Sequence, residues 1–276
     1  MQWVKGFVLF FLLCAPGLAQ KEKTLVVGLH PNVSSTTVLT LYQPVREHLT
    51  RTLARPVELR TAPDFRSYIE RTLKSEFDVI VTAPHLARLA QQKAGYVPIL
   101  YYSTELRAYV IATKDGDVRA LGDLRNQTVA APDSLTVITM IGLDFLKRKG
   151  LHPNKDFKLF DAKSHNNAAL SVANGQSAAA VIGSVPFAQL GPELRGRLRI
   201  VAETDSIPSQ FILAHSRLGS AETNKVKTAL SNYAASRDGK KFMEENGFGG
   251  FKVPDDRTMK RLEVYAAEVD RLVAKP

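Results

Sequence analysis

Short apolar runs alternate with amphipathic stretches along the chain, and this alternation constrains the fold more than any other feature. In the first half, apolar runs such as Thr24–Leu29 and Phe77–Thr82 flank stretches with apolar residues at helical spacing, such as Leu39–Leu53 and Phe65–Lys74. Strands that alternate with helices of about ten residues favour parallel sheets with right-handed crossovers. The predicted fold class is therefore α/β.

The same pattern restarts in the second half of the chain. A strand at Thr128–Ala131 precedes a helix at Thr136–Lys149, and another strand is expected at Ala178–Ile182. Because no flexible linker separates the halves, we expect two Rossmann-like lobes packed around a cleft. The extended segments 107–113 and 202–214 would be the crossings. The predicted boundaries are residues 20–112 with 205–276 for lobe 1, and residues 113–204 for lobe 2.

Residues 1–19 have the features of a secretory signal peptide. Lys5 precedes an apolar run, Gly6–Leu13, that is too short to span a bilayer, and small residues ending at Ala19 provide a cleavage site. The protein is therefore expected to be exported. Cys14 is the only cysteine, and Leu13 before it disfavours a lipid anchor. After cleavage, the fold would depend on burial and not on disulfides.

The net charge of +10 suits an anionic partner, or it reflects a merely basic surface. The densest basic cluster, Lys147-Arg148-Lys149, lies at a predicted helix end, where cations complement the helix dipole. No nucleic-acid-binding motif is present, so no nucleic-acid partner is expected. The sequence also lacks nucleophile-elbow and zinc-protease motifs and a phosphate-binding loop. We therefore predict a non-enzyme without a catalytic residue, metal or cofactor.

Strand-to-helix turns are the places where an α/β fold binds ligands, because free N–H groups at helix starts favour anions. Four such turns are candidates: residues 30–35, 82–85, 131–136 and 163–167. In the third, Ser134 and Thr136 can donate O–H bonds to an oxyanion; equally, Asp133 or Ser134 can simply cap the helix. In the fourth, His165 can donate to an oxyanion, or Ser164 can be a cap with His165 on the surface.

These turns, in this order, resemble the periplasmic phosphate/phosphite/phosphonate-binding proteins that serve ABC importers. The resemblance rests on Tyr42-Gln43-Pro44, on Asp78–Pro84, on Arg107 at the crossing strand, on Pro132–Val137 and on Lys163-Ser164-His165. The family's Pro-x-Ser-Thr-Ser-Gly turn is altered here by Leu135 and Val137, Leu106 replaces an aromatic residue, and Ala178 replaces an acidic one.

The resemblance implies a type II periplasmic binding protein whose lobes close on a small oxyanion, namely phosphonate, phosphite or phosphate. Ser134, Thr136 and His165 would hold the anion, with Tyr42 closing from the other lobe. The remaining candidate ligand contacts are Leu135, Ser164, His85 and Arg107. For Tyr42 the alternative is core packing, and for Arg107 it is an interlobe ion pair.

The implied partner is an ABC permease. The alternative partner is a membrane sensor kinase, and the alternative ligand is a different solute. The protein is expected to be a monomer.

Overall fold

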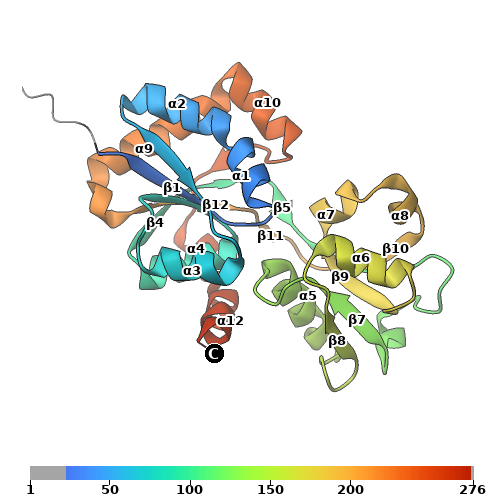
Figure 1. The fold of residues 1–276 in the computed structure, drawn as a ribbon. Helices are drawn as coiled ribbons and strands as arrows, with labels where there is room; N and C mark the ends of the chain where they lie inside the picture. Colours follow the sequence, from blue (N-terminus) through green and yellow to red (C-terminus); the bar gives the residue numbers. More distant parts are fainter. Residues whose placement is uncertain (1–22, 275–276) are drawn as a thin grey trace, which may run out of the picture.

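The computed structural model describes residues 23–274, so the predicted signal peptide and Cys14 lie outside the described residues. These residues form two α/β lobes (Figure 1). No helix among them is long and apolar enough to cross a membrane. The α/β fold class predicted from the sequence is confirmed.

Lobe 1 is built on a six-stranded sheet with the order β13-β4-β12-β3-β1-β2. Its strands are β1 (Leu25–Leu29), β2 (Val57–Arg60), β3 (Val79–Thr82), β4 (Tyr96–Tyr102), β12 (Phe211–His215) and β13 (Phe251–Lys252). Its α-helices are α1 (Ser35–Leu41), α2 (Gln43–Leu53), α3 (Phe65–Leu73), α4 (Pro84–Lys93), α9 (Gly219–Ala235), α10 (Arg237–Glu245), α11 (Asp256–Lys260) and α12 (Glu263–Val273), and a short 3₁₀ turn spans Ser216–Leu218.

Lobe 2 is built on a five-stranded sheet with the order β10-β6-β9-β7-β8. Its strands are β6 (Ala108–Thr113), β7 (Thr128–Ala131), β8 (Lys158–Asp161), β9 (Ala179–Gly183) and β10 (Leu198–Glu203). Its helices are α5 (Val137–Arg148), α6 (His165–Ala173), α7 (Ser184–Gln189) and α8 (Pro192–Gly196), with a 3₁₀ turn at Leu121–Leu124.

A small two-stranded ladder joins the lobes. Strand β5 (Glu105–Leu106) pairs antiparallel with β11 (Ile207–Pro208), so the chain crosses between the sheets twice at one place. Strand β6 already belongs to the second sheet, and the boundary expected after residue 112 falls inside this strand. The crossing into lobe 2 therefore ends several residues earlier than the sequence pattern indicated.

The sheets are mixed, whereas the alternation of strands and helices predicted parallel ones. Strands β1, β2 and β3 are parallel, but β12 returns from lobe 2 and inserts antiparallel between β3 and β4. In lobe 2, β6 enters antiparallel beside β9. Strands β6 and β12 are next to the crossings, where the chain changes lobe and arrives from the opposite direction. The edge strand β13 is also antiparallel to its neighbour β4.

One helix expected from the sequence is divided in the structure. The segment Leu39–Leu53 is interrupted at Tyr42, because Pro44 near the start of α2 has no N–H to continue the preceding helix. Near the C-terminus, α11 and α12 are likewise two separate helices.

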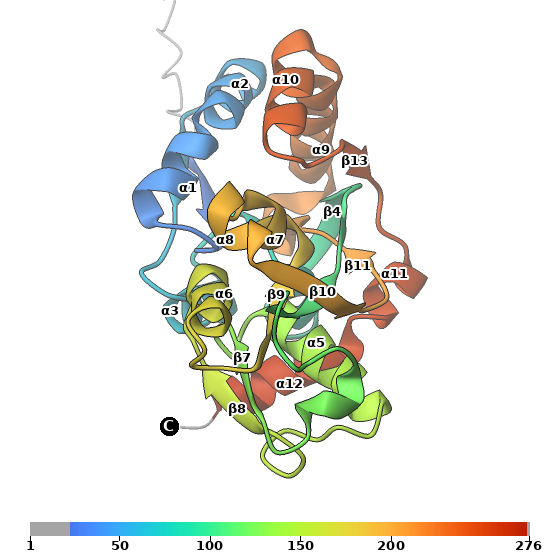
Figure 2. The same cartoon turned by 90° about the vertical axis from the view of Figure 1, so that its right-hand side faces the viewer.

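The C-terminal helix α12 lies against α4 and also approaches α5 of lobe 2 (Figure 2). Ion pairs of 2.6 Å, Arg88–Glu263 and Lys93–Asp270, attach it to α4. Tyr265 packs against the apolar clusters of both lobes. Helix α12 therefore contacts both lobes, through α4 of lobe 1 and α5 of lobe 2.

Candidate functional site

The turns that follow β3 and β7 meet at the interface between the lobes. His85 stands in the first turn of α4, and Leu135 stands in the turn before α5. The Nε2 atom of His85 lies 2.9 Å from the carbonyl oxygen of Leu135. Two residues of the predicted site are thus in direct contact across the lobes.

His85 uses its ring proton for this contact. Because Nε2–H donates to the Leu135 carbonyl, Nδ1 carries the lone pair, and this buried atom has no hydrogen-bond partner within residues 23–274. The pKa of His85 is lowered to about 4, mainly because the ring is buried. The hydrogen bond to Leu135 acts in the opposite direction and raises the pKa, but by less. The ring is neutral at pH 7, and its N–H joins the lobes.

Leu135 fastens the same turn to lobe 1 through its side chain. Only 7% of the residue is exposed, and it packs in the apolar cluster that contains Leu86, Leu89 and Ala266 of lobe 1. Burial of a leucine side chain contributes about 1.5–3 kcal/mol. The residue that the sequence marked as a lost hydroxyl therefore acts in packing between the lobes. We call the His85–Leu135 pair, with the Leu135 side chain, the interlobe latch.

The two hydroxyls of the lobe 2 turn have different surroundings. Thr136 caps α5: its Oγ1 accepts the N–H of Thr139 and donates to the Asp133 carbonyl at 2.9 Å. Ser134 is exposed, and its side chain makes no hydrogen bond within the described chain. The cap is therefore Thr136, and neither Asp133 nor Ser134 takes that position. Ser134 is the hydroxyl that stays available to a ligand.

The turn after β8 lies beside the turn after β7, because Ala131 and Asp161 are register partners in parallel strands. Ser164 is the N-cap of α6 and accepts the N–H of Asn167 at 3.1 Å. The capping role left open for Ser164 is the one that the structure shows. Both turns open helices whose first N–H groups lack partners within the helix.

His165 is half-buried and oriented by the backbone. Its Nδ1 accepts the N–H of Gly183, at the end of β9, at 3.3 Å. The proton of the neutral ring must then be on Nε2, which is left as a donor. Burial lowers the pKa of His165 to about 4, so this donor is neutral at pH 7. The arrangement suits hydrogen bonding to an anion without a fixed positive charge.

Arg107 lies at the same edge of lobe 2 but points to another partner. Its carbonyl accepts the N–H of Ser184, whereas its guanidinium pairs with Glu203 at 3.1 Å. Both partners of this ion pair adjoin the second sheet, so the pair is formed within lobe 2 and not between lobes. Because both side chains are exposed to solvent, the ion pair contributes little to stability, about 0–1 kcal/mol.

Tyr42 is buried in lobe 1. Its hydroxyl lies 3.1 Å from the Tyr102 hydroxyl and donates to Oε1 of Gln210 at 3.3 Å, and its ring contacts Phe242 and Phe248. Burial raises the pKa values of both tyrosines above their usual range. The described contacts of Tyr42 are all within lobe 1, so core packing with a satisfied hydroxyl describes it in this structure.

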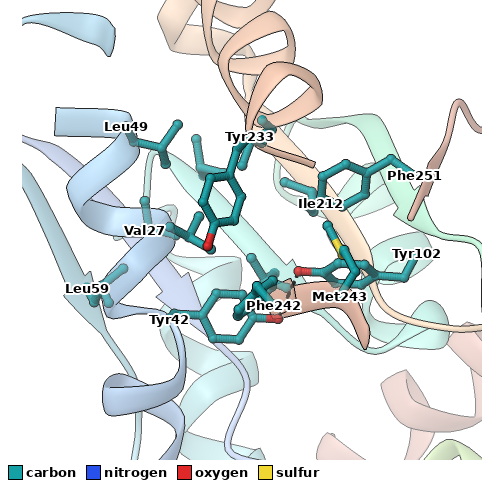
Figure 3. Close-up of a pocket in the computed structure, with 14 residues that line it drawn as sticks. Val27, Tyr42, Leu49, Leu59, Tyr102, Ile212, Tyr233, Phe242, Met243 and Phe251 are labelled. Atoms are coloured by element: carbon teal, nitrogen blue, oxygen red, sulfur yellow. Dashed lines mark hydrogen bonds between the residues drawn. The ribbon is translucent and has the colours of Figure 1, made fainter. Parts of the chain in front are cut away.

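Tyr42 and Val81 line two cavities of lobe 1. The first, about 20 Å³, lies among apolar side chains of the sheet and of α2, α9 and α10, and Tyr233 points into it (Figure 3). The second, about 10 Å³, lies at the end of β1 and is lined by His30, Asn32, Tyr42, Gln210 and Phe248 together with Leu29, Val38, Leu41 and Val81. We call the second one the strand-end pocket.

Sequence reasoning missed most of the strand-end pocket. His30 follows β1 in one of the four candidate turns, so the sequence did indicate that it could lie near a ligand. Nothing in the sequence indicated Gln210, because this residue reaches the pocket only through the insertion of β12 beside β3. Within residues 23–274, no group of three or more His, Cys, Asp or Glu side chains is placed to hold a metal ion.

Comparison with solved structures shows the same fold at low sequence identity. A structure of XAC2383 from Xanthomonas citri bound to chloride has a TM-score of 0.78 at 18% identity, covering 90% of this chain and 98% of that one. PhnD1 from Prochlorococcus marinus in complex with methylphosphonate has a TM-score of 0.78 at 15% identity, covering 90% and 99%. The aliphatic sulphonate-binding protein SsuA from Escherichia coli has a TM-score of 0.62 at 14% identity, covering 92% and 94%.

A family model matches residues 27–259, which is most of the chain. Its description is that of the periplasmic phosphonate substrate-binding protein of an ABC transporter. The resemblance seen in the sequence is thereby confirmed. The chain belongs to the phosphonate-binding family of periplasmic ABC-transporter substrate-binding proteins.

Proposed function

We propose that this protein captures a small phosphonate-class oxyanion between its lobes and delivers it to an ABC permease. The observation that carries the proposal is the convergence of Ser134, His165 and the starts of α5 and α6 at adjacent strand ends of lobe 2. A hydroxyl, a neutral N–H and two helix starts are the groups that hold a tetrahedral oxyanion.

Closure of the lobes is the second part of the proposal. The lobes are joined by the β5–β11 ladder, and hinge closure around a ligand is a common response of such two-lobed folds. Closure removes water, and hydrogen bonds to the anion gain strength in the lower dielectric. Thr136 and Ser164 support the site as helix caps. The Arg107 guanidinium is paired with Glu203, and the Nε2–H of His85 donates to the Leu135 carbonyl, so these donors are already occupied.

The experiment is a thermal-shift screen on the chain from Gln20, unfolded and refolded once to remove bound solute. Phosphate, phosphite, methylphosphonate, 2-aminoethylphosphonate and sulfate are tested. A ligand at about 100 times its Kd adds about 2.7 kcal/mol. For a domain of this size, the melting temperature then rises by roughly 5–10 °C.

Two substitutions assign the site. Ser134→Ala and His165→Gln should each weaken the best ligand at least several-fold by calorimetry without unfolding the protein. Ser220→Ala and His152→Gln are matched controls, since both residues are exposed and lie outside the interface. If all four variants bind the ligand with the same affinity, this site is rejected. If none of the tested oxyanions raises the melting temperature, the ligand class is rejected.

A further inference from the structure

The ring of His85 fits between the lobes in only one protonation state. It is fully buried, and its only hydrogen-bond partner within residues 23–274 is the Leu135 carbonyl, to which Nε2–H donates. A proton on Nδ1 would add a second N–H and a positive charge at a buried atom that faces no acceptor. Burying an unpaired charged donor is costly. The neutral ring with its proton on Nε2 is therefore the form that the joined lobes accept.

The burial of His85 depends on lobe 2. Leu135 and Met140 are the two lobe 2 members of an apolar cluster whose other buried residues all belong to lobe 1, including Leu86 next to His85. Both lie on the turn and first part of α5. Separation of the lobes withdraws these side chains together with the Leu135 carbonyl. Water then reaches the ring, and Nδ1 accepts a proton without the cost of burial.

The charged groups around α4 leave a protonated ring without a counter-ion. Helices α3 and α12 and strands β4 and β12 pack against α4. The α12 carboxylates that face α4, Glu263 and Asp270, are already paired with Arg88 and Lys93. Asp133 of the facing turn accepts the N–H of Leu135 at 2.7 Å.

The other titratable groups packed near α4 are not carboxylates. His30, at the end of β1, would oppose a charge on His85 if it were itself protonated. The titratable residues that pack in or against the apolar cluster of α4 are all tyrosines: Tyr68, Tyr96, Tyr101 and Tyr265. His215 stands at the end of β12 away from His85, because Phe211 at the other end is the register partner of Thr82.

We propose that the interlobe latch is proton-sensitive: the neutral His85 ring holds the lobes together in the ligand-free protein, and protonation of its Nδ1 atom separates them. The inference goes beyond the proposed function, because it concerns the protein without solute. Its outcome is therefore independent of which oxyanion is captured.

Proton linkage gives the size of the effect. The pKa of His85 is about 4 with the lobes together, mainly because of burial, whereas a histidine in water has a pKa of about 6.5. The separated form binds the proton more tightly, so a falling pH favours separation. The ratio of separated to joined molecules should rise about 25-fold from about pH 7.5 to about pH 5.

Distances between two labels measure this ratio in protein refolded once to remove bound solute. Thr36→Cys and Asn166→Cys place one label in each lobe at exposed positions. We expect the distances to lengthen as the pH falls, while circular dichroism shows that the protein stays folded. His85→Gln keeps an N–H donor at a similar reach but binds no proton in this range, so its distances should be the same at both pH values.

Two further histidine variants are matched controls. His152→Gln removes an exposed histidine of lobe 2, and His30→Gln removes the buried neighbour of His85. Both proteins should keep the pH response of the wild type. A His85→Gln protein that still separates in acid, or a His30→Gln protein that no longer does, would assign the response to another group and overturn the inference.

Leu135→Ala keeps the test decisive if the wild-type lobes are joined too firmly for the labels to register separation. This variant weakens the same contact and retains the His85 hydrogen bond, so the pH response should then be visible. Distances that do not change with pH in either protein would overturn the inference. That result would leave the proposed function standing, because no ligand takes part in the measurement.

Discussion

Leu135→Ala tests the interlobe latch directly. The substitution removes three buried carbon atoms, each worth about 0.8 kcal/mol, so the docked arrangement of the turn loses roughly 2 kcal/mol. Since about 1.4 kcal/mol is a factor of ten, the population with separated lobes should rise up to about 30-fold. The His85 hydrogen bond stays possible, because its acceptor is the backbone carbonyl.

Distances between paired spin labels would measure this population. Residues 20–276 have no cysteine, so Thr36→Cys on α1 and Asn166→Cys on α6 provide the two labels, both at exposed positions. Leu170→Ala is the matched control, because Leu170 is exposed on α6 and takes no part in the latch. Leu135→Ala should broaden the distance distribution toward longer values, and Leu170→Ala should not. Identical distributions in wild type and Leu135→Ala would refute the idea that this side chain holds the lobes together.

Three further predictions concern stability. Tyr233→Phe should leave the free energy of unfolding unchanged or raise it by about 1 kcal/mol, because the buried Tyr233 hydroxyl has no partner within residues 23–274; a urea titration that shows a clear loss would contradict this. Thr136→Ala should cost about 0.5–2 kcal/mol through the lost cap of α5, whereas Ser134→Ala should cost almost nothing, as measured by the same titration. Burial lowers the pKa values of His30, His85 and His165 to about 4, below the unfolded value of about 6.5. The unfolded chain therefore binds more protons in this window, and stability that is full above the unfolded value falls as the pH drops toward 4. His165→Gln should reduce the slope of the unfolding free energy against pH by the equivalent of about one proton. An unaltered slope would show that His165 is not buried as described.

Local features of the fold could be predicted from the sequence because they depend on neighbouring residues. The strand before Thr82 and the helix after Pro84 follow from an apolar run and a proline, and the interruption at Tyr42 had a signal in Pro44. The position of β12 could not be predicted, because its partners in β3 and β4 lie more than a hundred residues away. No local pattern records such a pairing.

The candidate site shows the same division. Ser134 and His165 could be proposed from the sequence because strand ends and helix starts mark ligand turns in any α/β fold. The role of Leu135 was not found, because an apolar residue in a polar turn has meaning only once lobe 1 is placed against it. Gln210 was missed for the same reason.

The insertion of β12 also has a consequence for how the chain reaches its fold. Lobe 2 is continuous in sequence from β6 to β10, so it can be completed early when the chain is made from its amino end. Lobe 1 lacks a central strand until His215 has appeared, and until then β3 and β4 each present an unpaired edge. Unpaired edges of this kind readily capture other chains. We therefore expect truncations before β12 to aggregate as they emerge, while the isolated segment from β6 to β10 stays soluble.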